Sequence, residues 1–407
     1  MLTTFYPPYN FGGDGIGIQR LARAFAKRDW AVTVVHQADA YVNLAKQRPA
    51  PAPPEPGIEV VSLESANPLA ANLITHQLGR PTVHAAELKR LLAPGAFDIV
   101  WFHNISLVGG PGILAYGDGI KLYEAHEHWL VCPTHVLWRH NKEVCDERQC
   151  LRCTLTYKRP PQPWRYTGYL ERELRHVDAF IAKSEFSREK HRQFGFPREM
   201  EVIPYFLPDI PLAADAGPRP QERPYFLFVG RLEKIKGVQD ILPAFEGAGA
   251  ADLLIVGTGE YEAELKALAG DNPRVKFAGR QPPEALTAYY RHAEALMVPS
   301  VCYETFGIIL IEAFRAGTPV IAREIGPFPE IVQRCGGGLL YNDRKSLVDG
   351  MNMLLADPER RRTLAQKARH GFETYWSEDA VMGAYYGLLR GLALARGRTG
   401  LLAALEG

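Results

Sequence analysis

The chain of 407 residues lacks the segments that would assign it to a special class of protein. No apolar run approaches the ~20 residues that a membrane-spanning helix needs. The N-terminal segment also lacks the basic and then apolar order of a secretory signal. A charge excess is missing as well, since 47 Lys and Arg residues balance 46 Asp and Glu residues. We therefore expect a cytoplasmic protein without a general attraction for nucleic acid, and peripheral contact with the inner face of the membrane stays open.

Cysteine is scarce, and its distribution is uneven. Four of the six cysteines follow one another with the spacing Cys132-x12-Cys145-x4-Cys150-x2-Cys153. This distribution is unlike the evenly cross-linked frameworks of small secreted domains. Four thiolates could hold a structural zinc ion or an iron-sulfur cluster, and the spacing does not identify the metal. Reduced or partly paired thiols in a loop are the alternative.

The length and the composition predict two domains with separate cores, since 46% of the residues are hydrophobic. Short apolar runs alternate with helical patterns, which is typical of parallel sheets. In the first half these runs are residues 31–35, 98–104, 120–126, 179–184 and 201–206. In the second half they are residues 225–230, 252–257, 275–279, 295–300 and 319–322.

A proline-rich and polar stretch at 208–224 separates the two series of runs. We therefore expect a first domain at 1–207, a linker at 208–224 and a second domain at 225–375. The amphipathic tail at 376–407 is expected to form a helix that docks on a domain. Only four residues separate Met1 from the first turn, so we expect a clipped opening strand and a natural start upstream.

Ligands of open parallel sheets bind beyond the carboxyl ends of the strands, so the residues that follow each run are the candidates for a site. Gly12 and Gly13 lie in a glycine-rich loop before a helix that we expect to begin near Ile18. Exposed amides there could approach an anion closely. An ordinary flexible turn is the alternative.

Two cations follow the first strand of the second domain. Arg231 and Lys236 lie five residues apart in the loop GRLEKIKG. A guanidinium offers paired hydrogen bonds and an ammonium offers a compact charge, so together they could bind a diphosphate. Solvated basic residues are the alternative interpretation.

Two glutamates mark the segment at 299–322. Glu304 precedes a predicted helix and Glu312 lies eight residues later, an advance of ~12 Å if the whole interval is helical. This matches the span from the sugar to the ribose of a nucleotide diphosphate sugar, and the amides of Thr305, Phe306 and Gly307 would face the phosphates. Exposed surface glutamates are the alternative. The sequence has no Asp-x-Asp pair, which favours diphosphate binding without a metal.

These motifs together resemble the retaining glycosyltransferases of the GT-B fold, in glycosyltransferase family 4 (glycosyl transferases group 1). The resemblance rests on YPPYNFGGDGIGIQRLARAFAKRDWAVTVV, YEAHEHWLVCP, SEFSREKHRQFGFP, GRLEKIKG and ETFGIILIEAFRAGTPVIA. It implies an α/β protein with two Rossmann-like parallel-sheet domains that face each other across a cleft. A C-terminal helix would cross back to the first domain. The first domain would bind the acceptor, and the second would bind the donor nucleotide.

The resemblance also implies roles for individual residues. Arg231 and Lys236 would contact the diphosphate, and Glu312 would contact the ribose. Glu304, with the Phe306 and Gly307 amides, would contact the donor sugar and its phosphate.

In the first domain, His126 would lie beside the transferred sugar, with His128 as a less favoured alternative. Gly12 and Gly13 would approach the donor, and base recognition would lie near Arg280 in the second domain.

The activity implied is metal-independent transfer of a sugar, with retained configuration, from a nucleotide diphosphate sugar to a glycan, a lipid-linked sugar or a small molecule. No further cofactor is required. A sugar-nucleotide epimerase, a phosphorylase and a non-catalytic sugar-nucleotide-binding protein are the alternatives. The basic and aromatic segment at 157–176 could contact lipid headgroups or an anionic acceptor, and an ordinary solvated helix is the alternative.

Overall fold

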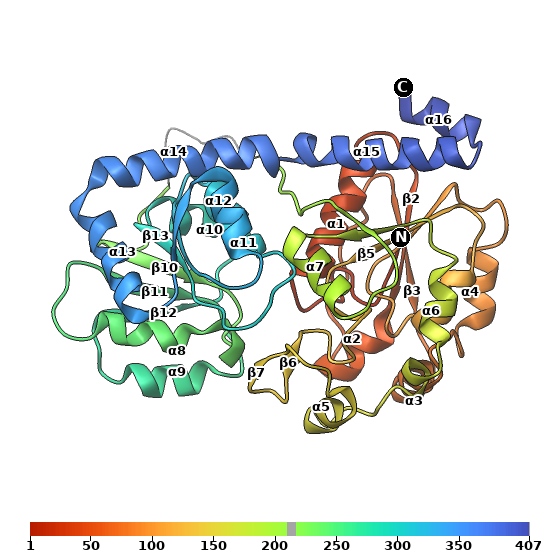
Figure 1. Ribbon diagram of the computed structural model, residues 1–407, viewed down its shortest axis with the longest axis horizontal. Coiled ribbons are helices and arrows are strands. Elements are labelled where there is room, and N and C mark those ends of the chain that lie inside the picture. Colours follow the sequence, from red (N-terminus) through yellow and green to blue (C-terminus); the bar gives the residue numbers. More distant parts are fainter. Residues whose placement is uncertain (210–216, 407) are drawn as a thin grey trace. The chain divides into compact units, whose positions relative to one another are not determined.

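The computed structural model describes residues 1–209 and 217–406 (Figure 1). The chain divides into two compact units. Unit 1 contains Met1–Pro204 and Val381–Gly407, and unit 2 contains Tyr205–Ala380. These boundaries differ by a few residues from the predicted ones at 207 and 376. The predicted linker at 208–224 includes residues 210–216, which lie outside the described residues.

Unit 1 is built on a seven-stranded parallel sheet. Its strands are β1 (Leu2–Thr3), β2 (Val32–Gln37), β3 (Ile58–Leu63), β4 (Ile99–Phe102), β5 (Ile120–Ala125), β8 (Ala179–Ala182) and β9 (Met200–Val202). Their order is β3-β2-β1-β4-β5-β8-β9. The opening strand β1 is only two residues long.

The connections of unit 1 are mostly helical. They are α1 (Gly13–Ala26), α2 (Ala38–Ala45), α3 (Pro68–Leu78), α4 (Ala85–Leu91), α5 (Cys150–Thr156), α6 (Tyr169–Leu174) and α7 (Glu185–Gln193). A small antiparallel hairpin, β6 (Trp138–Arg139) with β7 (Glu143–Val144), precedes α5. The C-terminal segment forms α15 (Glu378–Ala395) and α16 (Thr399–Glu406). The predicted start of the first helix near Ile18 was wrong, because α1 already includes the glycines from Gly13 onward.

Unit 2 contains a six-stranded parallel sheet. Its strands are β10 (Tyr225–Val229), β11 (Asp252–Val256), β12 (Val275–Gly279), β13 (Ala295–Val298), β14 (Val320–Arg323) and β15 (Gly338–Tyr341), in the order β12-β11-β10-β13-β14-β15. The helices are α8 (Val238–Ile241), α9 (Glu262–Ala269), α10 (Pro283–Arg291), α11 (Ile308–Arg315), α12 (Phe328–Cys335), α13 (Arg344–Ala356) and α14 (Pro358–Tyr375).

The two faces of the sheet in unit 2 pack against separate apolar cores. Along β10, Leu227 belongs to one core, whereas Phe226 and Phe228 belong to the other. Every residue of β10 and β13 is buried, as expected for central parallel strands that are covered on both sides. This packing fixes the carboxyl ends of the strands and the loops that follow them.

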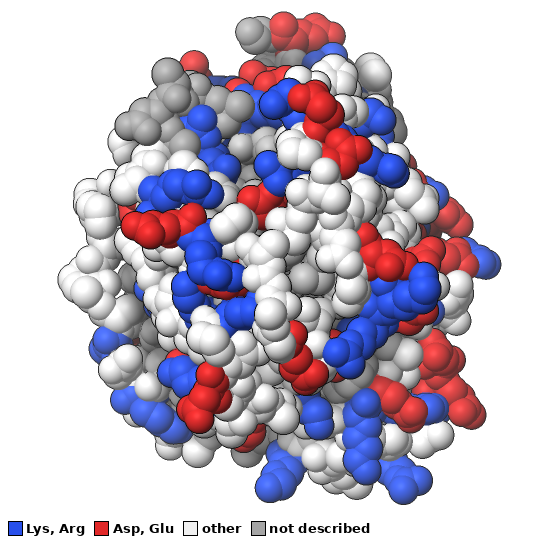
Figure 2. Space-filling view, turned by 90° about the vertical axis from the view of Figure 1, so that its left-hand side faces the viewer, with Lys and Arg blue, Asp and Glu red and all other residues white. Residues whose placement is uncertain are grey.

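The surface carries charges of both signs. Figure 2 shows basic and acidic side chains intermixed over one face, in keeping with the balanced composition. Of the helices in the described part of the chain, none is both long enough and apolar enough to cross a membrane.

Candidate active site

The sheet of unit 2 has a point where the strand order reverses, between β10 and β13. In open parallel sheets, ligands bind at such a point, beyond the carboxyl ends of the strands. The backbone N–H of Val301 donates to the carbonyl of Ile235 at 2.9 Å and joins the two loops. Gly237 has a φ of 72°, and a side chain there would collide with the carbonyl oxygen of Pro299. Only glycine therefore permits this approach of the loops.

An ion pair bridges the same two loops. Lys236 Nζ lies 2.8 Å from Glu304 Oε1, and the Ser300 hydroxyl donates to that oxygen at 2.9 Å. Burial opposes ionisation of both groups, but their mutual attraction outweighs it. The pKa of Lys236 is therefore raised and that of Glu304 is lowered. Both side chains are charged at neutral pH, so the loop presents an ammonium with N–H donors that Glu304 does not use.

Arg231 and Arg280 are more exposed than Lys236. The Arg231 side chain is 58% exposed, and its Nη1 lies 2.7 Å from Glu233 Oε1. Arg231 is also close enough to Glu304 to help lower the pKa of that carboxyl. Arg280 is exposed directly after β12. Among these predicted residues, the structure therefore brings Arg231, Lys236 and Glu304 together.

Glu312 has the hydroxyl partner that its apolar sequence neighbourhood requires. The Tyr290 hydroxyl on α10 donates to Glu312 Oε2 at 2.9 Å. Tyr290 is buried, and its carbonyl accepts a hydrogen bond from Thr318 Oγ1 at 2.7 Å. The sequence analysis did not identify Tyr290 as a partner of Glu312. Adjacent tyrosines in an amphipathic helix, here Tyr289 and Tyr290 of α10, are only a weak signal for a buried hydroxyl donor.

The segment between the two glutamates is only partly helical. Thr305 is half-buried, and Phe306 is buried against Tyr205 with ring centroids 5.7 Å apart. Gly307 has a φ of 107°, and α11 begins after it at Ile308. The predicted helical advance of ~12 Å from Glu304 to Glu312 was therefore wrong. The helical part from Ile308 to Glu312 accounts for only ~6 Å.

In unit 1 the glycine loop joins β1 to α1. Gly12 is half-buried and caps the helix, whereas Gly13 is exposed as its first residue. A side chain on Gly12 would meet only an ordinary contact, but one on Gly15 would collide with Asn10 Oδ1. The steric requirement for glycine therefore falls on Gly15, which the sequence argument did not single out.

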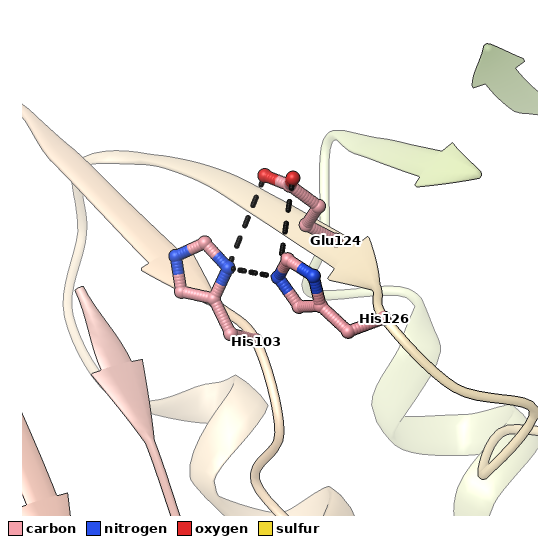
Figure 3. A group of neighbouring side chains, drawn as sticks. All are labelled: His103, Glu124 and His126. Atoms are coloured by element: carbon pink, nitrogen blue, oxygen red, sulfur yellow. Dashed lines mark hydrogen bonds and ion pairs between the residues drawn. The ribbon is translucent and has the colours of Figure 1, made fainter. Parts of the chain in front are cut away.

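His126 directly follows β5 and belongs to a buried polar cluster (Figure 3). Its Nε2 lies 2.9 Å from Nδ1 of His103, which follows the neighbouring strand β4. Glu124 lies against both rings, with oxygens 3.9 Å from each of these nitrogens. Burial lowers the pKa of His126 to about 4, even though Glu124 acts in the opposite direction. His126 is therefore a neutral imidazole at pH 7, with its Nε2 engaged by His103.

Two further residues complete this cluster. Lys183, which directly follows β8, forms a buried ion pair with Glu124 and donates to the Tyr385 hydroxyl at 2.9 Å. Tyr385, on α15, donates in turn to Glu124 Oε1 at 2.9 Å. Burial alone would raise the pKa of Glu124, but the charge of Lys183 and the hydrogen bonds from Lys183 and Tyr385 lower it. The donor atoms of His103, Glu124 and His126 lie within 4.8 Å of one another, as metal ligands would. Since the Lys183 ammonium already neutralises this carboxylate, we assign no metal here.

His128 lies in a different environment. Its ring stacks on His191 with centroids 5.4 Å apart, and it is buried. Its Nε2 has no hydrogen-bond partner among residues 1–209 and 217–406. His126 therefore belongs to the polar cluster beyond β4 and β5, whereas His128 packs against α7.

The four clustered cysteines lie around the hairpin and α5. Each is a free thiol, with Cys132 and Cys153 buried and Cys145 and Cys150 half-buried. Among the described residues, the cysteines form no group of three donors within 4.8 Å. Their sulfurs therefore stand wider apart than the ligands of a closed metal site.

Two family models match successive parts of the chain. "Glycosyl transferase 4-like domain" matches residues 12–205, and "Glycosyl transferases group 1" matches residues 210–371. The chain is a family 4 glycosyltransferase. The two matches correspond closely to unit 1 and unit 2, so both Rossmann-like units of this glycosyltransferase carry the family's sequence pattern.

Curated relatives of this glycosyltransferase include two D-inositol 3-phosphate glycosyltransferases. The protein from Xylanimonas cellulosilytica is 27% identical, over 91% of this chain and 90% of its own length. The protein from Corynebacterium efficiens is 34% identical, but the alignment spans only 38% of this chain and 40% of that protein.

Solved structures of the same fold extend over nearly the whole glycosyltransferase. Sucrose-phosphate synthase from Thermosynechococcus elongatus has a TM-score of 0.68 and 22% identity, and the match covers 97% of this chain and 98% of that one. Anabaena HepE in complex with UDP has a TM-score of 0.65 and 17% identity, and the match covers 96% and 99%. These matches identify the GT-B fold.

Proposed function

We propose that this glycosyltransferase moves a sugar from a nucleotide diphosphate sugar to an acceptor hydroxyl and retains the anomeric configuration. The observation that carries the proposal is the ion pair of Lys236 with Glu304 where the strand order of unit 2 reverses. This position is where open parallel sheets bind nucleotides. The UDP in the complex of Anabaena HepE is consistent with such a donor.

The donor would be bound through its charged parts. Lys236 and Arg231 would contact the diphosphate, because together they offer an ammonium and a guanidinium on one loop. The amides of Phe306 and Gly307 would supply further hydrogen bonds to the phosphate. Glu312, which is held by Tyr290, would accept from the ribose hydroxyls.

The transfer step would use the other carboxylate and the histidine of unit 1. Glu304 would contact the donor sugar, with Lys236 and Ser300 holding its carboxylate in place. His126 would lie beside the transferred sugar as a neutral imidazole, positioned by His103. The departing phosphate oxygen would take the proton of the acceptor hydroxyl as the new glycosidic bond forms. Arg231 and Lys236 would stabilise the negative charge that develops on the phosphate.

We propose that this stabilisation needs no catalytic metal. Two cations and the backbone amides near Gly307 supply the positive potential that a divalent ion would otherwise provide. Gly12 and Gly13 would let the backbone of unit 1 approach the donor, and the exposed Arg280 would lie near the base. The acceptor would be a glycan, a lipid-linked sugar or a small molecule.

The test combines ligand binding with analysis of the product. UDP-, GDP- and ADP-sugars are added to the protein one at a time. The sugar nucleotide that binds the folded protein should raise its unfolding temperature. The NMR spectrum of the product formed with an acceptor should then show the anomeric configuration of the donor. A product with the opposite configuration, or no effect from any donor, would contradict the proposal.

The same assay separates the alternatives. A sugar nucleotide converted without acceptor would indicate an epimerase, and dependence on inorganic phosphate would indicate a phosphorylase. Binding without turnover would indicate a non-catalytic protein.

We also propose that unit 1 contacts a membrane with anionic headgroups. Helix α3 buries small or polar residues and exposes large aliphatic ones, the reverse of an ordinary surface helix. The exposed residues are Leu69, Leu73, Ile74 and Leu78. Gln77 donates to the carbonyl of Pro161 at 2.8 Å, and the exposed Lys158 and Arg159 shortly precede Pro161 in the chain. Apolar side chains beside cations fit an anionic lipid surface.

Vesicle co-sedimentation tests this contact. The protein should sediment with vesicles that contain anionic lipid and remain in the supernatant with purely zwitterionic ones. The Leu73→Glu/Ile74→Glu variant should lose this binding, whereas Leu268→Glu in unit 2 should retain it. Equal sedimentation of the wild type with both kinds of vesicle would contradict the proposal.

A further inference from the structure

Arg323 is the last residue of β14, the strand beside β13 in the sheet of unit 2. The residue before it, Ala322, pairs with Val298 at the end of β13. This register places Arg323 beside Pro299, which directly follows β13. Pro299 begins the loop that leads to Glu304, so Arg323 lies next to a loop of the proposed donor site.

The direction of the Arg323 side chain follows from the alternation of residues along β14. Ile321 belongs to one apolar core of unit 2, whereas Val320 and Ala322 belong to the other. Side chains two residues apart in a strand point to the same face of the sheet. Arg323 therefore extends toward the face of Ile321, and α8 packs in the same core as Ile321.

The Arg323 guanidinium binds one group on each side of the donor site. Its Nε donates to the carbonyl of Pro299 at 3.1 Å, and its Nη2 forms an ion pair with Asp240 Oδ2 at 2.6 Å. Asp240 lies on α8, directly after the loop that carries Lys236. The guanidinium also lies over the ring of Tyr341 on β15, 5.3 Å from the ring centroid. Only 21% of the Arg323 side chain is exposed, so these contacts are more restricted than those of a solvated surface ion pair.

Both partners of Arg323 contact the backbone beside Lys236. The backbone N–H of Asp240 donates to the carbonyl of Gly237 at 3.0 Å. The carbonyl oxygen of Pro299 lies so close to Gly237 that a side chain there would collide with it. Arg323 therefore holds both sides of the approach that brings Lys236 to its carboxylate partner.

An arginine suits this position better than a lysine. Its planar fork donates to a carbonyl and a carboxylate at once, and the aromatic ring beside it restricts its orientation. An ammonium would keep the charge but would not reproduce this fixed fork. Loss of the fork would allow the two loops to separate, although every proposed ligand of the donor would still be present.

We propose that Arg323 is a positioning residue of the donor site, which holds the loop after β10 against the loop after β13 so that Lys236 and Glu304 meet the donor together. The inference rests on the proposed binding of the diphosphate by Lys236. It adds a residue that acts through Lys236 and does not itself contact the ligand. Substitution of Arg323 should therefore weaken diphosphate binding only while Lys236 is present.

A double-mutant cycle tests this inference, with calorimetric titration of the full-length protein by the nucleoside diphosphate of the preferred donor. Arg323→Gln should weaken binding about fivefold, and by no more than Lys236→Ala does. Arg323→Lys should weaken it less. In the Lys236→Ala background, Arg323→Gln should cause no further loss.

Two outcomes would overturn the inference while the proposed function stands. One is unchanged binding by Arg323→Gln, and the other is an equal loss in both backgrounds, which would show that Arg323 does not act through Lys236. Unchanged binding by Lys236→Ala alone would contradict the proposed function, and this inference with it.

Arg344→Gln is the matched control. Arg344 also donates to a carbonyl of unit 2, that of Pro243 at 2.6 Å, and lies 3.7 Å from Glu246, but neither partner belongs to the two donor loops. This variant should bind the diphosphate as the wild type does. The same loss in Arg344→Gln as in Arg323→Gln would contradict a positioning role.

A milder variant keeps the test valid if Arg323→Gln does not fold. Asp240→Asn weakens one contact of the guanidinium and leaves Arg323 in place. It should weaken diphosphate binding by a smaller factor than Arg323→Gln, and again only while Lys236 is present. Wild-type affinity in Asp240→Asn, or a loss that persists in the Lys236→Ala background, would contradict the inference.

Discussion

Lys236 and Glu304 illustrate how single side chains acquire their chemistry from loops that lie far apart in the sequence. Each residue stabilises the charged form of the other, and Ser300 adds a hydrogen bond to the carboxylate. The sequence alone predicted both residues as donor ligands. It did not predict that they contact each other, because that contact depends on which strands are neighbours.

The two glutamates should respond differently to substitution. Glu304→Gln removes the charge beside the donor sugar and should lower kcat, whereas Glu312→Gln weakens the contact with the ribose and should raise the KM for the donor. A charge-assisted hydrogen bond contributes about 1.5 to 3 kcal/mol, so each change should be about tenfold or more. Steady-state kinetics measure both, and wild-type values for both variants would remove the basis of the assignment.

The sequence did not predict the hydrogen-bond partners of the candidate site residues. Glu312 lies in the apolar sequence IILIEAF, where a buried carboxylate needs a hydroxyl or amide partner, but that partner, Tyr290, lies on another helix. His103 lies in the predicted run at 98–104 and was given no role, because its contact with His126 follows from the pairing of β4 with β5. Such pairs require the order of the strands, which local pattern does not give.

Helix α15 is attached to the rest of unit 1 through buried polar contacts as well as apolar packing. Tyr385 contacts both Glu124 and Lys183, while the neighbouring Tyr386 accepts a hydrogen bond from Trp30 at 2.9 Å. The amphipathic pattern predicted a docking helix in the tail. The pattern did not indicate that Tyr385, a buried residue of this helix, would form hydrogen bonds with both members of the ion pair between Lys183 and Glu124.

Tyr385→Phe should lower the free energy of unfolding of unit 1 by about 1 to 3 kcal/mol, because the hydroxyl serves two buried charged groups. Urea denaturation measures this loss. Tyr386→Phe is the matched control, since its hydroxyl lies in a partly exposed position and should matter less. Equal losses for the two variants would show that the buried contacts contribute nothing of their own.

Most elements could be predicted because central parallel strands are continuous apolar runs. The exceptions have local reasons. β3 has exposed and half-exposed residues, and β15 begins with glycine, so neither gives a clear buried pattern. The start of α1 was misplaced because its first turns contain Gly13, Gly15 and Gly17, and glycine ordinarily disfavours a helix.

At the scale of the whole molecule, buried histidines make unit 1 sensitive to acid. Burial lowers the pKa of His36, His126 and His191 to about 4, against about 6.5 in an unfolded chain. Between these values the unfolded state binds protons that the folded state does not. The free energy of unfolding should therefore fall as the pH falls from 6.5 to 4, by up to about 1.4 kcal/mol per pH unit for each histidine.

Urea denaturation at pH 7 and pH 5 tests this dependence, and limited proteolysis identifies the part that opens. Unit 1 should unfold at lower urea at pH 5, with the first cleavage sites inside it. The same midpoint at both pH values, or first cleavage in unit 2, would contradict the prediction.

The proposed function depends on binding of the donor diphosphate by the loop after β10. Calorimetric titration with the nucleoside diphosphate of the preferred donor tests it most directly, in wild type and in the Arg231→Ala, Lys236→Ala and Lys234→Ala variants. Loss of either proposed ligand, Arg231 or Lys236, should weaken binding about tenfold or more. The exposed Lys234 in the same loop is the control and should be dispensable. If Lys236→Ala binds the diphosphate as tightly as the wild type and Lys234→Ala do, the claim is wrong.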